Sequence, residues 1–300
     1  MPAAEGRAAS GLRARLNAIG PVRALLTRPA VEHVVALVNR SSVIARGRAR
    51  FLARELLGRR DEVLYPVRGF PHPVLVRHGS ADVVTLDDVF YSRDYDVPPP
   101  VEEVLAAADR PLRVLDLGGN VGYFGAFVLA GYPDAEITSV EADPRNARAL
   151  RRVVAATGQG NRWKVIEAAA STGEGTARFV QALYSTAHVA RAGETSATTE
   201  VPAIDVLPLL DGADLVKIDI EGSEWPILAD PRFPAAAIRA VALEYHPEGC
   251  PEPDARTAAE RILREAGYAT RPGGHHPAGM GVMWGWRSEP APTGAPAPPR

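Results

Sequence analysis

From residue 113 onward, short apolar runs alternate with longer segments in which apolar residues recur at helical spacing. The short runs predict strands at 113–117, 136–140, 164–168, 215–220 and 240–245. The longer segments predict helices at 121–130, 145–157, 224–228 and 254–266. Two last runs, at 268–271 and 282–287, predict a closing hairpin. We therefore expect an α/β fold with a mostly parallel sheet, helices on both faces, and an antiparallel strand at or near one edge.

The part of the chain before residue 110 follows a different pattern. Residues 12–58 place apolar residues at helical spacing among many arginines, which predicts two or three amphipathic helices. Their basic face could bind an anionic partner, but a solvated face on a capping or dimerising element is favoured. Residues 63–67 and 73–77 predict two strands of a small cap.

These patterns divide the chain into four parts. We expect an N-terminal helical extension at 1–60, a cap and linker at 61–109, and an α/β domain at 110–288. The tail at 289–300 is rich in proline and alanine and is expected to be disordered. The N-terminal helices could join two copies of the chain into a homodimer.

Composition narrows the possible partners and location. The formal net charge of -2 gives no global field that would recruit nucleic acid or a membrane surface. No apolar run is long enough to span a bilayer, and the N-terminus lacks the pattern of a signal peptide. Cys250 is the only cysteine, so neither an internal disulfide nor a zinc cluster can form. These features favour a cytoplasmic protein.

The strongest local motif is a glycine-rich turn between the strand at 113–117 and the helix that follows it. Gly118, Gly119 and Gly122 permit a tight turn and close approach of a ligand to the backbone. Asp116 at the strand end would repel a pyrophosphate, but it suits a ligand with an ammonium group, such as S-adenosylmethionine. Glu141 ends the next strand, about 20 residues further on, where an acidic residue is expected to hold ribose hydroxyls.

We therefore expect an adenosyl cofactor at the carboxyl ends of the strands. The predicted contacts from the turn and the next strand are Asp116, Gly118, Gly119, Asn120, Gly122, Tyr123, Phe124 and Glu141. Tyr91 and Tyr95, which precede the α/β part, could close over the cofactor or simply pack within the cap.

These motifs resemble the FkbM family of methyltransferases. The resemblance runs through residues 116–122, 140–144 and 168–175, and it ends with Glu244-Tyr245-His246. It is sharpest at Lys217-Ile-Asp-Ile-Glu-Gly-Ser-Glu224, and it covers roughly residues 91–286. The resemblance implies a Rossmann-like class I methyltransferase fold and O-methylation of a sugar or secondary metabolite. It adds Ala142 and Ala169 to the expected cofactor contacts.

The expected catalytic residues are Asp219, Glu244 and His246. They follow or end two predicted strands, and neighbouring parallel strands bring such ends to one rim. A hydroxyl acceptor must lose its proton, and His246 or Asp219 could be the general base. Alternatively, Asp219, Glu221 and Glu244 could hold a divalent ion such as Mg2+. Direct base catalysis is favoured because no compact metal motif is visible.

Several other interpretations remain open. A nicotinamide-dependent oxidoreductase is disfavoured by Asp116, and a non-catalytic binding module by the retained acidic residues. Nucleic-acid methylation lacks support from charge or motif. Glu224 is expected at the surface or paired with Lys217. The segment that contains Tyr184, Ser185 and His188 shows no periodicity and is interpreted as a substrate loop.

Overall fold

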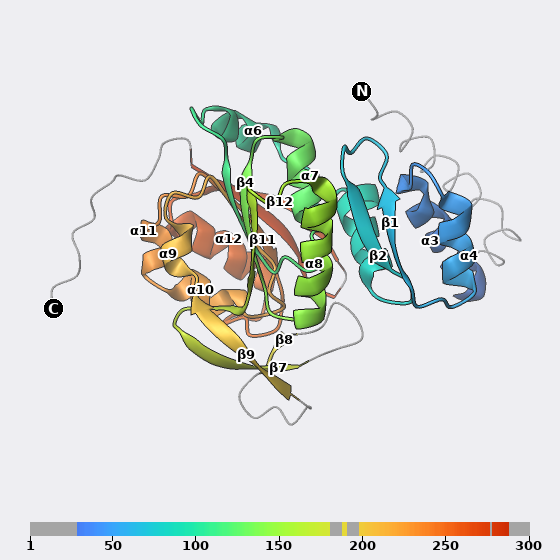
Figure 1. The fold of residues 1–300 in the computed structure, drawn as a ribbon. Coiled ribbons are helices and arrows are strands. Elements are labelled where there is room, and N and C mark those ends of the chain that lie inside the picture. Colours follow the sequence, from blue (N-terminus) through green and yellow to red (C-terminus); the bar gives the residue numbers. More distant parts are fainter. Residues whose placement is uncertain (1–28, 181–187, 191–197, 277, 288–300) are drawn as a thin grey trace, which may run out of the picture.

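The computed structural model describes residues 29–180, 188–190, 198–276 and 278–287 (Figure 1). The predicted tail, residues 12–28, Tyr184 and Ser185 lie outside these residues. A seven-stranded sheet has the order β12-β13-β11-β10-β3-β4-β5. Its strands in chain order are β3 (Arg113–Leu117), β4 (Glu136–Glu141), β5 (Trp163–Glu167), β10 (Leu215–Ile218), β11 (Ala240–Tyr245), β12 (Ala269–His275) and β13 (Gly281–Trp286).

The direction of the strands confirms the expected mostly parallel sheet. β3, β4, β5, β10 and β11 pair in parallel with one another. β13 runs antiparallel to both of its neighbours, β11 and β12. The hairpin therefore places its antiparallel strand one position in from the edge. This is the α/β arrangement that the family resemblance implies.

Helices cover both faces of this sheet. One face packs against α6 (Pro99–Ala106), α7 (Tyr123–Gly131) and α8 (Pro144–Thr157), and the other against α9 (Leu207–Leu210), α10 (Glu224–Ala229), α11 (Arg232–Ala235) and α12 (Ala255–Glu265). Because side chains alternate along a strand, Val114 joins the first core and Leu115 the second. Asp143 caps the N-terminus of α8 by accepting a hydrogen bond from the Arg145 amide, and Pro144 is the first residue of the helix.

A second, four-stranded sheet was not predicted. It consists of β6 (Ala169–Ser171), β7 (Gly175–Val180), β8 (His188–Val189) and β9 (Thr198–Asp205), in the order β6-β9-β7-β8. The interpretation of this region as an irregular loop is wrong for its described part. β7 and β9 are largely exposed and bury only a small cluster around Phe179 and Val201, so their apolar pattern is weak.

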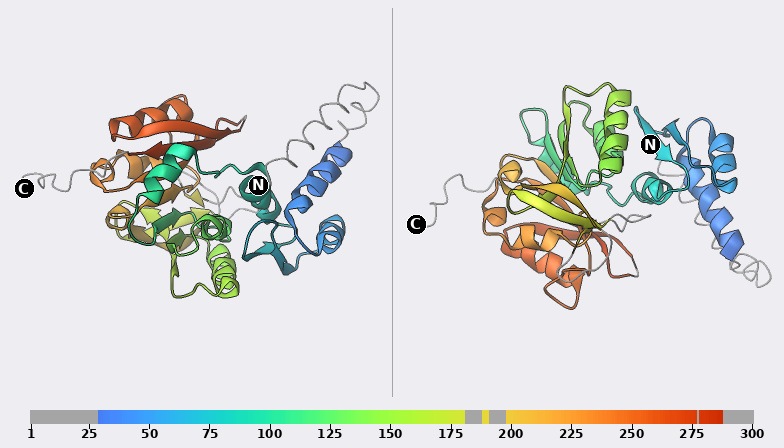
Figure 2. Two further views of the ribbon diagram at one scale, coloured as in Figure 1. Left: turned by 90° about the horizontal axis from the view of Figure 1, so that it is seen from above. Right: turned by 60° about the horizontal axis from the view of Figure 1, so that its bottom comes forward.

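The N-terminal elements form a module beside the main sheet, on the side away from the C-terminus (Figure 2). They are α3 (Pro29–Arg40), the 3-10 turn η1 (Ser41–Val43), α4 (Arg48–Leu56), β1 (Glu62–Pro66), β2 (Pro73–Arg77), α5 (Asp82–Leu86) and the π-helical turn η2 (Asp87–Ser92). The predicted hairpin is confirmed, since β1 and β2 pair antiparallel. One hydrophobic core runs from this module into α7 and α8, so the two parts pack as one body.

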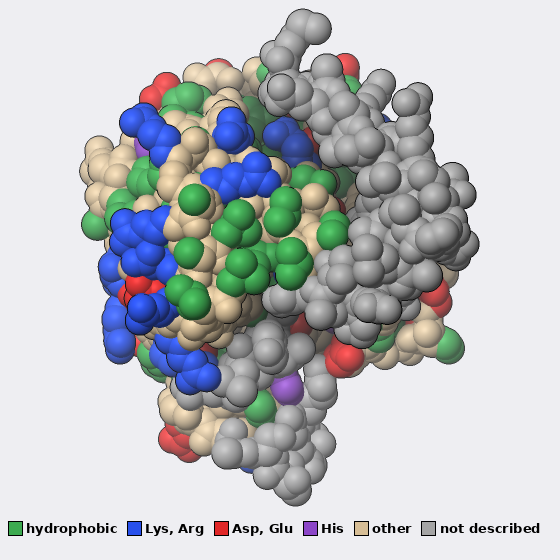
Figure 3. All heavy atoms as spheres, turned by 90° about the vertical axis from the view of Figure 1, so that its right-hand side faces the viewer, with side chains coloured by type: hydrophobic (Ala, Val, Ile, Leu, Met, Phe, Trp, Pro, Cys, Tyr) green, Lys and Arg blue, Asp and Glu red, His purple; other side chains and the backbone are tan. Residues whose placement is uncertain are grey.

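The outer face of this module carries exposed hydrophobic side chains among arginines (Figure 3). Those on α3, α4 and β1, or just beyond them, are Val34, Val38, Leu56, Leu57 and Leu64. Dimerisation through this region stays a prediction. Within the described residues, no helix has both the length and the apolar character required to cross a membrane.

Candidate active site

A pocket of about 440 Å3 opens at the carboxyl edge of the main sheet. Its walls come from three parts of the chain. The strand ends contribute Gly118, Asn120, Glu141 and Asp219, and the second sheet contributes Phe179 and Val189. The third wall is the loop at 77–82, which follows β2 of the N-terminal module. The cap and the unpredicted sheet thus enclose a site that the main sheet alone would leave open.

Some residues of the glycine-rich turn line the pocket, and others face the core. Gly118 lines the pocket with a φ of 82°, and a Cβ there would lie 1.7 Å from the Asp219 carbonyl oxygen. A side chain is therefore excluded at this position. Asn120 also lines the pocket. Gly119 and Gly122 do not, because they face Ser139 and Leu150, which a Cβ would meet at 2.9 and 2.5 Å.

Glu141 occupies the end of β4 with its carboxylate held from the backbone. One oxygen accepts a hydrogen bond from the Asn120 amide at 2.7 Å, and the other accepts from the Asp143 amide at 2.8 Å. The side chain is 6% exposed, and burial raises the pKa of Glu141 to about 7. Ala142 and Ala169 line the same part of the pocket, as expected. This end combines an acceptor-only carboxylate with small apolar side chains.

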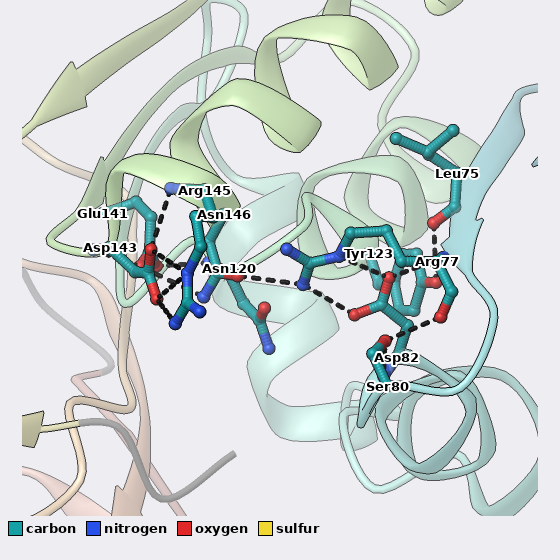
Figure 4. A network of polar contacts seen from close by, with 10 residues as sticks. All are labelled: Leu75, Arg77, Ser80, Asp82, Asn120, Tyr123, Glu141, Asp143, Arg145 and Asn146. Atoms are coloured by element: carbon teal, nitrogen blue, oxygen red, sulfur yellow. Dashed lines mark hydrogen bonds and ion pairs between the residues drawn. The ribbon is translucent and has the colours of Figure 1, made fainter. Parts of the chain in front are cut away.

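A polar network ties this end to the cap (Figure 4). The Arg77 guanidinium donates to both Asp82 oxygens, at 2.9 and 2.7 Å, and to Asn146 Oδ1 at 2.8 Å. Asn146 in turn directs its Nδ2 to Glu141 at 3.4 Å. The cap therefore reaches the Glu141 carboxylate through two side chains.

Two residues of α7 that were predicted to contact the cofactor, Tyr123 and Phe124, lie in the core and not in the pocket lining. Tyr123 is 1% exposed, and its hydroxyl donates to the Leu75 carbonyl of β2 at 2.8 Å. Phe124 is 4% exposed and packs edge-on against Tyr95, with ring centroids 5.3 Å apart. Neither lines the pocket, because the first turn of α7 directs both rings toward the core that the sheet shares with the cap.

Asp116, also expected to contact the cofactor, does not line the pocket either. Asp116 is fully buried and accepts a hydrogen bond from Ser139 Oγ at 2.9 Å. It lies inside β3, where the register places it between Ser139 on β4 and Lys217 on β10. The Lys217 ammonium is 3.5 Å from Asp116, 3.0 Å from Asp219 and 2.8 Å from the Gly118 carbonyl. Asp116 therefore neutralises a buried lysine and does not line the pocket.

Charged side chains gather where β10 and β11 end. We call Asp219, Glu221 and Glu244 the acidic rim. Asp219 and Glu221 line the pocket, with 24% and 25% of their side chains exposed. His246 is 2% exposed and does not line the pocket, but its Nε2 lies 3.5 Å from Glu221. The structure thus brings the predicted catalytic residues together while placing His246 next to the rim instead of on it.

Crowding of like charges changes the acidity of the rim. Burial and the Asp219 charge raise the pKa of Glu221 to about 8 and that of Glu244 to about 7. Burial alone lowers the pKa of His246, but the hydrogen bond and charge of Glu224 outweigh it and raise the pKa to about 10. Glu244 therefore has a pKa near neutrality, which suits proton transfer at physiological pH.

Two residues of this site were missed or misplaced by the sequence analysis. The Tyr95 hydroxyl donates to Glu244 at 2.5 Å and lies 3.5 Å from Asp219, so it bridges two carboxylates of the acidic rim. Glu224 was expected at the surface or with Lys217, yet it is fully buried. It accepts hydrogen bonds from the amides of Gly222 and His246 and lies 3.2 Å from the His246 ring. The sequence gives one indication of this burial: Glu224 directly follows Ser223, at the start of a helix whose side chains are mostly buried.

Comparison with known proteins points to methyltransferases. The family model described as "Methyltransferase FkbM domain" matches residues 116–269, more than half of the chain. Among solved structures, the chain is similar to magnesium protoporphyrin IX methyltransferase from Synechocystis PCC 6803 with bound SAM. The identity is 14% and the TM-score 0.40, over 68% of this chain and 83% of that chain. It is also similar to M. jannaschii TYW2 in complex with AdoMet, at 12% identity and a TM-score of 0.40, over 76% and 86%. No curated protein matches the chain.

Proposed function

Because the chain belongs to the FkbM methyltransferase family, we propose that it uses S-adenosylmethionine to methylate a hydroxyl oxygen of a small molecule, a sugar or a secondary metabolite. One observation carries this proposal. A single pocket is lined by a backbone-held carboxylate, Glu141, and by two members of the acidic rim, Asp219 and Glu221, while Glu244 lies behind them outside the pocket lining. We further propose that the protein works in the cytoplasm and does not act on nucleic acid.

The residues of the pocket fit the cofactor. Glu141 would accept hydrogen bonds from the ribose hydroxyls, and Ala142, Ala169 and Phe179 offer apolar surface for the adenine ring. Gly118, which has no side chain, lets the methionine part approach the backbone. The Asp219 carboxylate suits a ligand that carries positive charge at this end.

When bound, S-adenosylmethionine supplies an electrophilic methyl group on a positively charged sulfur. The protein must then orient the acceptor hydroxyl and take its proton. Asp219 lines the pocket and is fixed by Lys217 at 3.0 Å, while Glu244 shares the Tyr95 hydroxyl with it. We propose that the Asp219–Glu244 pair takes the proton, since the pKa of Glu244 lies near 7. His246 supports the rim from the buried side.

Two measurements test this function. S-adenosylhomocysteine should bind the full chain in calorimetry, and radiolabelled methyl should pass to members of a panel of glycosylated and hydroxylated metabolites. No binding of S-adenosylhomocysteine would remove the proposal. Methyl transfer to nitrogen or carbon acceptors alone would remove its oxygen specificity.

Asp219→Asn tests the reactive end separately. We expect kcat to fall by about 10³-fold, which is within the usual range for lost acid–base catalysis. Affinity for S-adenosylhomocysteine should change by less than about threefold, because Asp219 is partly exposed and already paired with Lys217, so its attraction for the ammonium group of that product is weak. Asp211→Asn, an exposed aspartate beyond α9, is the matched control and should keep full turnover. Undiminished turnover in Asp219→Asn would show that the acidic rim is not the reactive end.

A further inference from the structure

Three side chains at the acidic rim converge on one point. Asp219, Glu221 and His246 each offer a ligand atom, and these atoms lie within 4.8 Å of one another. An ion bound at about 2.1 Å to each ligand would hold opposite ligands about 4.2 Å apart. Adjacent ligands would lie about 3 Å apart, so the three side chains would move together by up to about 2 Å around the ion. Two carboxylate oxygens and one imidazole nitrogen form a donor set that divalent first-row ions accept.

His246 is oriented as a ligand would be. Its side chain is 3% exposed, and in the described part of the chain its Nε2 makes no hydrogen bond. That nitrogen points toward Glu221, 3.5 Å away. On the opposite side of the ring, Nδ1 lies 3.2 Å from the buried Glu224 carboxylate. A carboxylate that holds one nitrogen of a histidine so that the other faces the metal is a recurrent feature of metal sites.

Glu224 is fixed for this role independently of His246's ring. Its carboxylate accepts the Gly222 amide at 2.9 Å and the His246 amide at 2.9 Å. It is fully buried, so its position is set by the turn between β10 and α10. The imidazole is therefore held from behind before any ligand arrives.

The charge balance also calls for a cation. Five carboxylates lie at or next to this end of the sheet: Asp116, Asp219, Glu221, Glu224 and Glu244. Among the residues that the structure describes, Lys217 pairs with Asp116 and Asp219, and the His246 ring lies 3.5 Å from Glu221 and 3.2 Å from Glu224. The carboxylates outnumber these two basic groups. A divalent ion would add positive charge beside Asp219 and Glu221.

We propose that Asp219, Glu221 and His246 bind a divalent metal ion at the inner end of the pocket. The ion replaces the proton that the imidazole otherwise holds on Nε2. Its remaining positions face the pocket and take the acceptor hydroxyl, which lowers the pKa of that hydroxyl. This role rests on the proposed function, but binding of the ion does not.

Binding of Mn2+ to the full chain tests the site without any turnover. Electron paramagnetic resonance of free Mn2+ during a titration should show a single tight ion per chain. Pulsed resonance of the bound ion should show coupling to a directly bound imidazole nitrogen. His246→Asn should abolish that coupling, and Glu221→Gln should weaken Mn2+ binding by more than about 100-fold. Glu224→Gln should weaken binding by about 10- to 100-fold, as expected for a group that orients a ligand.

Controls separate this site from other acidic surfaces and from the proposed function. Glu136→Gln changes an exposed glutamate at the opposite end of the sheet and should leave Mn2+ affinity unchanged. Melting curves of each variant identify loss of folding, and Glu221→Gln serves if His246→Asn unfolds. Absence of Mn2+ binding, or bound Mn2+ without nitrogen coupling, would overturn the site. Calorimetry with S-adenosylhomocysteine on the same samples tests the proposed function, which can stand or fall independently.

Discussion

Both ends of the pocket have a carboxylate at the end of a strand, but the two carboxylates have different partners. Glu141 and Asp219 both follow buried parallel strands and both line the pocket. Glu141 meets backbone amides from Asn120 and Asp143. Asp219 instead meets charged groups and a phenol: Lys217 and Tyr95. The role of a carboxylate at a strand end therefore depends on its neighbours. Backbone amides suit it to bind hydroxyls, and charged neighbours suit it to proton transfer.

The register of the sheet causes this difference. Lys217, Asp116 and Ser139 are paired neighbours on three adjacent strands, so their side chains share one face. Lys217 on β10 lies within reach of Asp219, whereas Glu141 is two strands away on β4, where the Asn120 and Asp143 backbone supplies amides instead. The reactive end consequently depends on a buried ion cluster, and the cofactor end depends on hydrogen bonds.

The largest expected effect is a loss of stability when Lys217, the buried cation at the charged end, is replaced. Lys217→Met leaves Asp116, which is fully buried, and Asp219 without their cation. The free energy of unfolding should fall by about 3–5 kcal/mol, the usual cost of removing one partner of a buried ion pair. Urea unfolding followed by circular dichroism measures it.

The chain provides a matched control, because its only other lysine, Lys164, is exposed on β5. Lys164→Met should leave stability within about 0.5 kcal/mol of the original. Adding Asp116→Asn to Lys217→Met removes the orphaned charge and should restore most of the loss. If the double variant is no more stable than Lys217→Met, the lysine acts through packing and the charge argument is wrong.

A smaller effect, on cofactor affinity, is expected at the Glu141 end of the pocket. Burial raises the pKa of Glu141 to about 7, and ribose hydroxyls donate to its ionised form. Above that pH the carboxylate is already ionised, whereas below it binding must release a proton. Affinity for S-adenosylhomocysteine should therefore fall about tenfold between pH 8 and pH 6. Calorimetry in buffers of different ionisation enthalpy would reveal the proton released.

The same group has the opposite effect on stability. A folded-state pKa above the unfolded value means that its contribution is fully present below the unfolded pKa of about 4.5 and is lost as the pH rises through about 7. Glu141→Gln should remove the pH dependence of affinity together with this contribution to stability. Retention of the tenfold change in Glu141→Gln would assign it to another group.

Much of this architecture follows from the sequence, and the exceptions have physical causes. The apolar strands of the main sheet, Glu141 and Asp219 were predicted because burial and strand ends leave local patterns. Asp116 was misread, although its alternation with the buried Leu115 and Leu117 already places it on the opposite face of β3. Tyr95 was given only an uncertain role, since its partner Glu244 lies 149 residues away and no local pattern links them.

The second sheet marks another limit. Strands β7 and β9 bury only two residues each, so neither alternation nor an apolar run reveals them. The role of the cap was equally hidden, because only the folded chain brings the loop at 77–82 to the pocket. The local sequence pattern thus identified the strand-end residues of the site, whereas the parts supplied by the cap and the second sheet depend on tertiary packing.

The smallest expected effect concerns that cap. Arg77 holds the Asp82 carboxylate and the Asn146 side-chain oxygen, which leaves the Asn146 amide directed at Glu141. Arg77→Ala should weaken S-adenosylhomocysteine binding by about fivefold, close to 1 kcal/mol for one lost positioning contact. Turnover at saturating cofactor should not change, because the acidic rim makes no contact with Arg77. Arg148→Ala, on the exposed side of α8, is the control and should leave both quantities intact. A fall in kcat without a loss of affinity would show that the cap acts on the reactive end, and the separation of the two ends would fail.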